Sequence, residues 1–189
     1  MKIVGLVQAR MGSTRLPGKV LLPLAGRPLV GHIFDRLRAT KGVDGVVLAT
    51  TVDARNDPLV AFAAREGVPA YRARGEDDIA ERLAGAVRLG NADAILKVNG
   101  DCPLIDPKVL ELLVERFMQG DVDYVSNKIR WTWPEGLSAE VIGRSALDRC
   151  DEDLVTAEDR EFVANLIRDR RETFRVASVE GPMDLTRYK

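Results

Sequence analysis

Short apolar runs alternate with segments of helical periodicity along the first 120 residues of the chain. We expect strands at residues 3–8, 46–50, 69–72 and 94–98, and helices at residues 27–40, 57–67, 77–89 and 106–117. Such an alternation is typical of a mostly parallel sheet with helices on both faces. The chain is short enough for one domain, so we predict a single α/β domain over residues 1–189.

The remainder of the chain is less regular. We expect strands at residues 123–126, 139–142 and 174–178, and helices at residues 145–150 and 159–170. Between the first two strands, the loop at residues 131–136 holds Trp131 and Trp133. These rings can stack on a ligand, fill the core or cover an interface between subunits, and the sequence leaves all three open.

Charge and hydropathy exclude several classes of protein. The 28 lysines and arginines nearly balance the 29 aspartates and glutamates, which argues against bulk binding of nucleic acid or of an anionic membrane. No apolar run approaches the ~18 residues of a membrane-spanning helix, and the N-terminal run is too short for a signal peptide. Two cysteines, Cys102 and Cys150, fit a reducing compartment, so we expect a cytoplasmic protein.

A cationic, glycine-rich loop follows the first strand. Residues 9–24 carry Arg10, Arg15 and Lys19, and no acidic residue occurs before Asp35. Free backbone N–H groups combined with fixed positive charge bind phosphates, so we predict a nucleoside triphosphate site. The loop has neither the Walker A pattern nor G-x-G-x-x-G. The alternative is that these arginines are merely solvated and that the glycines and prolines only shape the turn.

Polar clusters follow three of the predicted strands, at residues 10–19, 50–56 and 99–101. In open α/β sheets, ligands bind beyond the carboxyl ends of the strands, so these clusters are expected to converge. Asp101 follows a strand and the small residue Gly100, a position from which a carboxylate can hold Mg²⁺ together with phosphate oxygens. The alternative is that Asp101 only caps the turn before Pro103.

Two further residues have a structural interpretation that we favour over a catalytic one. Cys102 has no identifiable base nearby in the sequence, which favours a small residue in a tight turn. His32 falls on a predicted helix and is expected to be a helix-face residue.

The acidic run Glu76, Asp77, Asp78 and Glu81 is typical of a solvated helix start, where the helix dipole favours negative charge.

Five ordered motifs resemble those of a known family. They are VQARMGSTRLPGKVL (7–21), VVLATT (46–51), VNGDCPLIDP (98–107), DYVSN (123–127) and PEGLSAEV (134–141). Together they resemble the spore-coat polysaccharide biosynthesis branch of the cytidylyltransferases, relatives of the CMP-sialate and CMP-Kdo synthetases, over essentially the whole chain. The resemblance implies a Rossmann-like nucleotidyltransferase fold. It also implies a Mg²⁺-dependent reaction of CTP with an acidic sugar, giving a CMP-sugar and pyrophosphate for surface polysaccharide biosynthesis.

The resemblance also implies roles for individual residues. The nucleotide-wrapping loop would use Ala9, Arg10, Met11, Gly12, Ser13, Arg15 and Lys19. Asp101 would be the Mg²⁺ ligand, with Arg10, Arg15 and Lys19 as its catalytic partners. Arg74, Asp78 and Arg82 would lie near the base and ribose, and Asn99, Glu135 and Glu140 would lie towards the sugar.

The chain departs from the family pattern at its end. The family usually continues past a segment like residues 184–189 into a strand bearing V-D-T-P-E-D, whose first Asp is a second metal ligand. We therefore expect that the sequence lacks a C-terminal segment, the alternative being that Glu180 replaces this ligand.

The rival functions are a glycosyltransferase that uses a sugar nucleotide and a non-catalytic nucleotide-binding protein. Asn99-Gly100-Asp101 stands where such glycosyltransferases commonly carry D-x-D, which disfavours the first rival. The sequence does not identify the sugar, and the resemblance is compatible with a homodimer.

Overall fold

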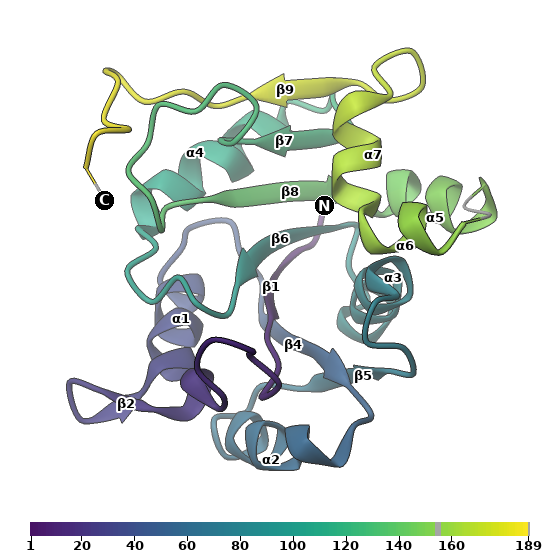
Figure 1. The fold of residues 1–189 in the computed structure, drawn as a ribbon. Coiled ribbons are helices and arrows are strands. Elements are labelled where there is room, and N and C mark those ends of the chain that lie inside the picture. Colours follow the sequence, from purple (N-terminus) through teal and green to yellow (C-terminus); the bar gives the residue numbers. More distant parts are fainter. Residues whose placement is uncertain (154–155, 189) are drawn as a thin grey trace.

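The computed structural model describes residues 1–153 and 156–188 and contains a seven-stranded mixed sheet in the order β5-β4-β1-β6-β8-β7-β9 (Figure 1). The strands are β1 (Ile3–Gln8), β4 (Val46–Thr51), β5 (Ala70–Ala73), β6 (Ala94–Asn99), β7 (Tyr124–Ser126), β8 (Ala139–Gly143) and β9 (Val176–Ser178). The first four in chain order pair in parallel, as the alternation of apolar runs and helices predicts. The predicted α/β class is confirmed.

The sheet changes direction between β6 and β8. β8 runs antiparallel to both β6 and β7, with Lys97 opposite Glu140 and Val98 opposite Ala139. Because of this reversal, the beginning of β8 lies beside the end of β6. Residues from the start of β8 therefore reach the edge of the sheet at which the parallel strands end.

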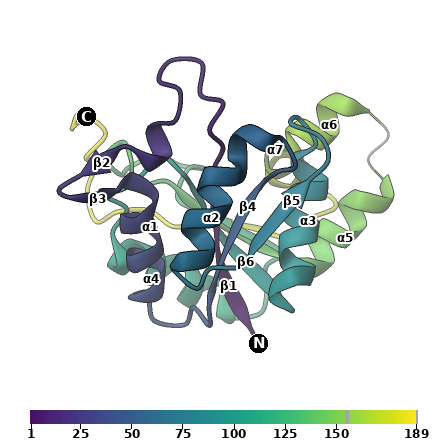
Figure 2. The same ribbon diagram turned by 90° about the horizontal axis from the view of Figure 1, so that it is seen from below.

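Helices cover both faces of the sheet (Figure 2). They are α1 (Leu29–Arg38), α2 (Asp57–Arg65), α3 (Ile79–Gly90), α4 (Pro107–Met118), α5 (Arg144–Asp153), α6 (Ala157–Glu161) and α7 (Val163–Asp169). One core packs α1, α2 and α4 on the sheet around Phe34 and Leu110, and the other packs α3, α5 and α7 around Leu83 and Ile142. Within the described residues, none of the helices is both long and apolar enough to cross a membrane.

Side-chain caps fix the starts of the helices that border the carboxyl edge of the sheet. Asp78 accepts a hydrogen bond from the backbone N–H of Glu81 at 2.8 Å, and Asp106 accepts one from that of Lys108 at 2.8 Å. Each cap satisfies a backbone donor that the helix itself leaves free. The predicted start of α4 at Asp106 and Pro107 is confirmed, whereas the cap of α2 is Asn56, one residue before the predicted Asp57.

Several segments differ from the sequence-based expectation. The loop predicted at residues 9–24 contains a 3₁₀ turn, η1 (Lys19–Leu21), and the short strand β2 (Pro23–Leu24). β2 pairs with β3 (Arg27–Pro28), so α1 begins at Leu29 rather than at residue 27. The strand predicted from Phe174 begins at Val176, and the buried Phe174 precedes it.

The helix predicted at residues 159–170 is two helices separated at Phe162. α7 buries Val163 and Ile167 against the sheet, whereas α6 buries none of its residues. The break lets Arg160 of α6 donate a hydrogen bond to Asp78, at the start of α3, at 2.8 Å. A single continuous helix could not make both contacts. The local period of residues 159–170 does not reveal the contact with Asp78, and it therefore predicts one helix.

Candidate active site

A cleft of about 450 Å³ lies at the carboxyl edge of the parallel strands. Its walls are the loop after β1, which rises above the sheet edge in Figure 2, the end of β6, the start of α3 and the junction of α6 and α7. The predicted site residues that line it are Ala9, Arg10, Gly12, Ser13, Arg15, Lys19, Arg82, Asn99 and Asp101. The structure thus brings together the polar clusters that follow β1 and β6.

The loop after β1 is closed on itself and tied to the segment after β4. The Met11 carbonyl accepts the N–H groups of Ser13 and Gly18, both at 2.9 Å, and Gly18 has a φ of +72°. The Met11 N–H donates to Asn56 Oδ1 at 2.8 Å, and the buried Asn56 amide donates to Thr51 Oγ1 at 2.7 Å. Met11 therefore holds the shape of the loop and does not line the cleft.

Gly100 allows the ends of β1 and β6 to approach closely. A Cβ at this position would lie 2.5 Å from the Cβ of Ala9, and the Gly100 N–H donates to the Gln8 carbonyl at 2.9 Å. No side chain fits in that space without a shift of the backbone. The glycine consequently places the neighbouring Asp101 beside the cationic loop.

Lys19 and Asp101 form an ion pair across the cleft, with Nζ 2.8 Å from Oδ2. Burial raises the pKa of Asp101, but the Lys19 ammonium more than offsets this effect, so that the pKa lies below its usual value. Asp101 is therefore a carboxylate at neutral pH. One carboxylate fits Mg²⁺ that takes its other ligands from phosphates and water, and the described residues hold no cluster of three or more metal-binding side chains.

A second ion-pair network neutralises the other side of the loop. Glu76 accepts from Arg10 at 3.0 Å and from Arg55 at 3.1 Å, and Arg55 also pairs with Asp53 at 2.5 Å. The sequence contains no acidic residue near the loop cations, yet the fold supplies carboxylates from distant segments. Arg10 and Lys19 thus gain partners that are distant in sequence, whereas Arg15 forms no ion pair within residues 1–153 and 156–188.

Arg82 is a buried cation at the wall of the cleft. It is 2% exposed, and its Nη2 donates to the carbonyls of Gly75 and Glu76 at 3.2 and 2.6 Å. Burial, and then the neighbouring Arg10, lower its pKa. In the part of the chain that the structure describes, its Nε–H has no acceptor, and Gln8 Oε1 in the same cleft has no donor. Two residues of the cleft lining thus each carry a buried polar atom that lacks a hydrogen-bond partner among the described residues.

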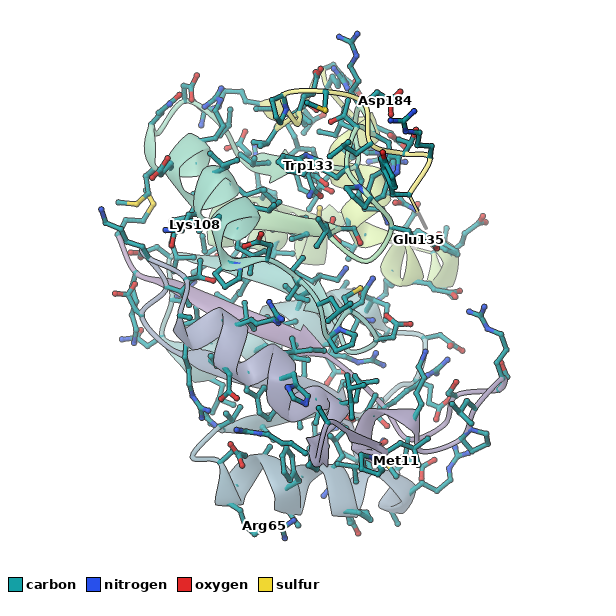
Figure 3. All side chains as sticks on the ribbon, turned by 90° about the vertical axis from the view of Figure 1, so that its left-hand side faces the viewer. Met11, Arg65, Lys108, Trp133, Glu135 and Asp184 are labelled. Carbon is teal, nitrogen blue, oxygen red and sulfur yellow. The ribbon has the colours of Figure 1, made fainter. Side chains whose placement is uncertain are left out.

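Besides Met11, three predicted site residues line neither this cleft nor the smaller cavity beside it. Arg74 is exposed, and its backbone N–H donates to Glu81 at 3.3 Å. Asp78 caps α3 and pairs with Arg160, so its carboxylate is engaged in structural contacts. Glu135 is exposed, and Figure 3 labels it in the upper half of the molecule with Trp133, whereas Met11 lies in the lower half. Roles for these three in ligand binding stay predictions.

A smaller cavity of about 170 Å³ adjoins the cleft on the side of β6 and β8. The two share part of their lining: Gln8, Ile79, Asn99, Glu161 and Phe162. At its floor, Lys97 Nζ lies 2.5 Å from Glu140, which also accepts the Tyr124 hydroxyl at 2.5 Å. Burial raises the pKa of Glu140, but Lys97 and Tyr124 more than offset this, so the pKa lies below its usual value.

The loop between β7 and β8 forms another wall of the smaller cavity with Lys128 and Ser138. Buried Asn127 closes the base of this loop: its Nδ2 donates to the Leu137 carbonyl at 2.7 Å, and its Oδ1 accepts the Ala139 N–H at 3.0 Å. Trp133 in the same loop is 8% exposed and donates to the Val179 carbonyl at 3.1 Å. Of the alternatives left open for this tryptophan, the structure shows core packing.

The structural interpretations of Cys102 and His32 are confirmed. Cys102 is buried, and burial together with the Asp101 charge raises the pKa of its thiol to about 11, which leaves little nucleophilic thiolate. His32 lies on α1, and its Nε2 is 2.7 Å from the Leu24 carbonyl. The histidine thus ties the β2–β3 ribbon to the helix.

Sequence reasoning missed several residues that the structure places in the two cavities. These are Gln8, Glu76, Asp77, Lys97, Lys128, Ser138, Glu161 and Asn165. Gln8 carried a detectable signal, because it is the polar residue that ends an apolar strand at the ligand-binding edge. Lys128 and Glu161 carried none, because exposed charged residues in a loop and a helix are common throughout such chains.

The sequence model of the cytidylyltransferase family matches residues 4–135. The chain belongs to this family. It is similar to the spore coat polysaccharide biosynthesis protein SpsF of Bacillus subtilis (strain 168), with 32% identity over 187 residues that cover 95% of this chain and 75% of SpsF. It is also similar to a 3-deoxy-manno-octulosonate cytidylyltransferase of Anaeromyxobacter sp. (strain Fw109-5), with 36% identity over 150 residues, 78% of this chain and 59% of that protein.

Solved structures agree with this membership. A cytidylyltransferase from Leptospira borgpetersenii superposes on this family member with a TM-score of 0.92 and 33% identity, covering 100% of this chain and 80% of that one. A CMP:2-keto-3-deoxy-manno-octonic acid synthetase, solved in complex with CTP, gives a TM-score of 0.72 at 21% identity, covering 99% and 94%. The second likeness establishes the shared Rossmann-like nucleotidyltransferase fold.

Proposed function

We propose that this cytidylyltransferase family member activates an acidic sugar with CTP in a Mg²⁺-dependent reaction that releases pyrophosphate. One observation carries the proposal. A single cleft gathers the cationic loop after β1, the Asp101 carboxylate, and an unpartnered donor and acceptor on Arg82 and Gln8. The names of the similar curated proteins, with 3-deoxy-manno-octulosonate as an acidic sugar, support the choice of substrates.

The phosphate end of the nucleotide is assigned to the loop after β1. Arg15 has no carboxylate partner among the described residues, and Lys19 and Arg10 are held by Asp101 and Glu76 at the cleft wall. A sugar hydroxyl attacks the α-phosphorus, so that a new O–P bond forms as the bond to pyrophosphate breaks. The three cations position the triphosphate and offset the charge that grows on the departing oxygens.

Asp101 is the residue that would hold Mg²⁺, shared with the triphosphate. When bound there, the metal supplies charge neutralisation and lowers the pKa of a coordinated hydroxyl. The expectations of a further metal carboxylate beyond Lys189, of a cytoplasmic location and of a homodimer remain predictions.

The nucleoside end is assigned to the wall formed by β1 and α3. The Arg82 Nε–H needs an acceptor, and Gln8 Oε1 needs a donor, because buried polar groups without partners are costly. A cytidine nucleoside presents both kinds of group through its carbonyl oxygen, hydroxyls and exocyclic amine. If both side chains turn toward the cleft on binding, the nucleoside satisfies the two buried groups.

A nucleotide screen tests the proposal. CTP with Mg²⁺ is expected to raise the melting temperature more than UTP, ATP or GTP, because a ligand that binds the folded state stabilises it. Arg82→Lys lacks the Nε–H and is expected to lose the preference for CTP. Arg65→Lys is the matched control, because Arg65 lies on α2 outside both cavities.

Product analysis then separates the rival functions. Release of free pyrophosphate in the presence of CTP and an acidic sugar supports the proposal. Transfer of a sugar from a sugar nucleotide indicates a glycosyltransferase instead. Tight CTP binding without turnover of any acid sugar indicates a non-catalytic nucleotide-binding protein, and equal melting shifts for all four nucleotides leave only phosphate binding.

A further inference from the structure

Four charged side chains line the smaller cavity, and two of them form an ion pair with each other. Lys97 and Glu140 pair with each other at the floor, in direct register across β6 and β8. Lys128, from the loop after β7, and Glu161, at the end of α6, line the same cavity. Neither has an ion-pair partner within residues 1–153 and 156–188. The cavity therefore presents one cation and one anion that are available to a ligand.

This cavity adjoins the proposed triphosphate site. It shares Gln8 and Asn99 with the larger cleft, and Asn99 is two residues before Asp101. Lys128 lines this cavity together with Asn99, so its side chain lies on the same side of the cleft as the strand end that leads to Asp101. A group bound by Lys128 is therefore held on the acceptor side of the proposed triphosphate site.

We propose that Lys128 is the specificity-determining residue that binds the carboxylate of the acceptor, while Glu161 accepts hydrogen bonds from its hydroxyl groups on the helical wall. The inference rests on the proposed function and names the determinant of its substrate class. Lys97 cannot take this role, because Glu140 already neutralises it. Two lysines and two glutamates line the cavity, and this lack of net positive charge favours a singly charged carboxylate over a phosphate monoester, which carries close to two negative charges.

The test compares matched acceptors and matched variants. The acceptors are 3-deoxy-manno-octulosonate and other 2-keto acid sugars, each alongside its neutral C1 amide, together with sugar phosphates. Lys128→Met removes the proposed cation. Arg130→Met removes a cation two residues away that pairs with Glu180 and lines neither cavity.

We expect the unmodified enzyme to prefer the acid over its amide by about 10- to 100-fold in kcat/KM, the range of one charge-assisted hydrogen bond. Lys128→Met is expected to lose this preference through a higher KM for the acid alone. Its KM for CTP and the melting shift produced by CTP should stay unchanged. Arg130→Met and Glu161→Gln should keep the acid-over-amide ratio, whereas Glu161→Gln should raise the KM for acid and amide together.

One result overturns the inference while leaving the proposed function intact: pyrophosphate release by Lys128→Met with the same acid-over-amide ratio as the unmodified enzyme. Turnover of phosphorylated or neutral acceptors only overturns both the inference and the choice of an acidic sugar in the proposed function. If the unmodified enzyme releases no pyrophosphate from CTP with any acceptor, the proposed function fails, and the inference falls with it.

Discussion

Replacing Lys19 with methionine is expected to change metal binding and nucleotide binding in opposite directions. The Lys19 ammonium lies 2.8 Å from the carboxylate of Asp101, the residue proposed to hold Mg²⁺. A divalent cation that arrives alone must displace this ammonium and approach it against charge repulsion. The triphosphate, in contrast, draws Lys19 away. Lys19→Met should therefore bind a divalent cation more tightly when no nucleotide is present, and bind CTP more weakly.

The size of the effect follows from the geometry of the pair. At 2.8 Å the Coulomb attraction is about 6 kcal/mol for an effective dielectric constant of about 20, and about 1.5 kcal/mol for that of water. The two side chains are 26% and 48% exposed, so the net free energy of the pair is expected to be near ~1 kcal/mol. Its removal should raise metal affinity about fivefold. The loss of a charged hydrogen bond to phosphate should weaken CTP binding about 10- to 100-fold.

Titration with Mn²⁺, followed by electron paramagnetic resonance, measures the metal affinity without any turnover. Calorimetry measures the CTP affinity of the same preparations. Lys108→Met is the matched control, because Lys108 forms its ion pair with Glu111 on the exposed surface of α4. Unchanged or weaker Mn²⁺ binding by Lys19→Met alone would refute the view that Lys19 competes with the metal for Asp101.

Three further predictions concern the residues around Asp101. Gly100→Ala places a Cβ 2.5 Å from Ala9 and should lower the free energy of unfolding by about 1–3 kcal/mol in urea titrations, whereas Gly45→Ala, with open space around it, should be nearly neutral. The pKa of Asp101 is lower in the folded state than the usual 3.8, so its stabilising contribution is present above about pH 5 and is lost as the pH falls through the folded-state pKa. Asp101→Asn should remove that part of the acid dependence, and urea titrations over a pH series that show identical profiles would contradict this. Because the pKa of Cys102 is raised to about 11, Cys102→Ser should keep turnover with CTP, and iodoacetamide should modify the native protein only slowly near neutral pH.

The alternation of strands and helices was enough to predict the parallel half of the sheet. The bounds of β1 and the start of α4 at Asp106 were read correctly, because an apolar run and an Asp-Pro pair are local signals. The break at Phe162 was not predictable in the same way. It arises from a contact between Arg160 and Asp78, which are far apart in sequence, and no local periodicity encodes such a contact.

In the candidate site, too, local sequence signals predict some residues, whereas residues that act through distant contacts are not predicted. Arg10, Lys19 and Asp101 were found from the sequence because loop charge and strand-end position are local properties. Their partners were not found, since Glu76 reaches Arg10 across 66 positions of the chain. The same holds for Asn56, whose amide anchors the loop through Met11 and Thr51. A polar residue in a polar cluster gives no indication of which of its neighbours it will hold.

The amide of Asn127 has a consequence for how this enzyme can change its substrate. By bonding the Leu137 carbonyl and the Ala139 N–H, it joins the two ends of the segment 128–138, which brings Lys128 and Ser138 to the smaller cavity. A loop whose ends are fixed at its base tolerates changes of length and composition with little entropic cost. The cationic loop, Arg82 and Asp101 belong to other elements. If this segment holds the acceptor as proposed, it is a replaceable module, and exchanging it between relatives offers a route to new sugar nucleotides while the half proposed to bind CTP is left untouched.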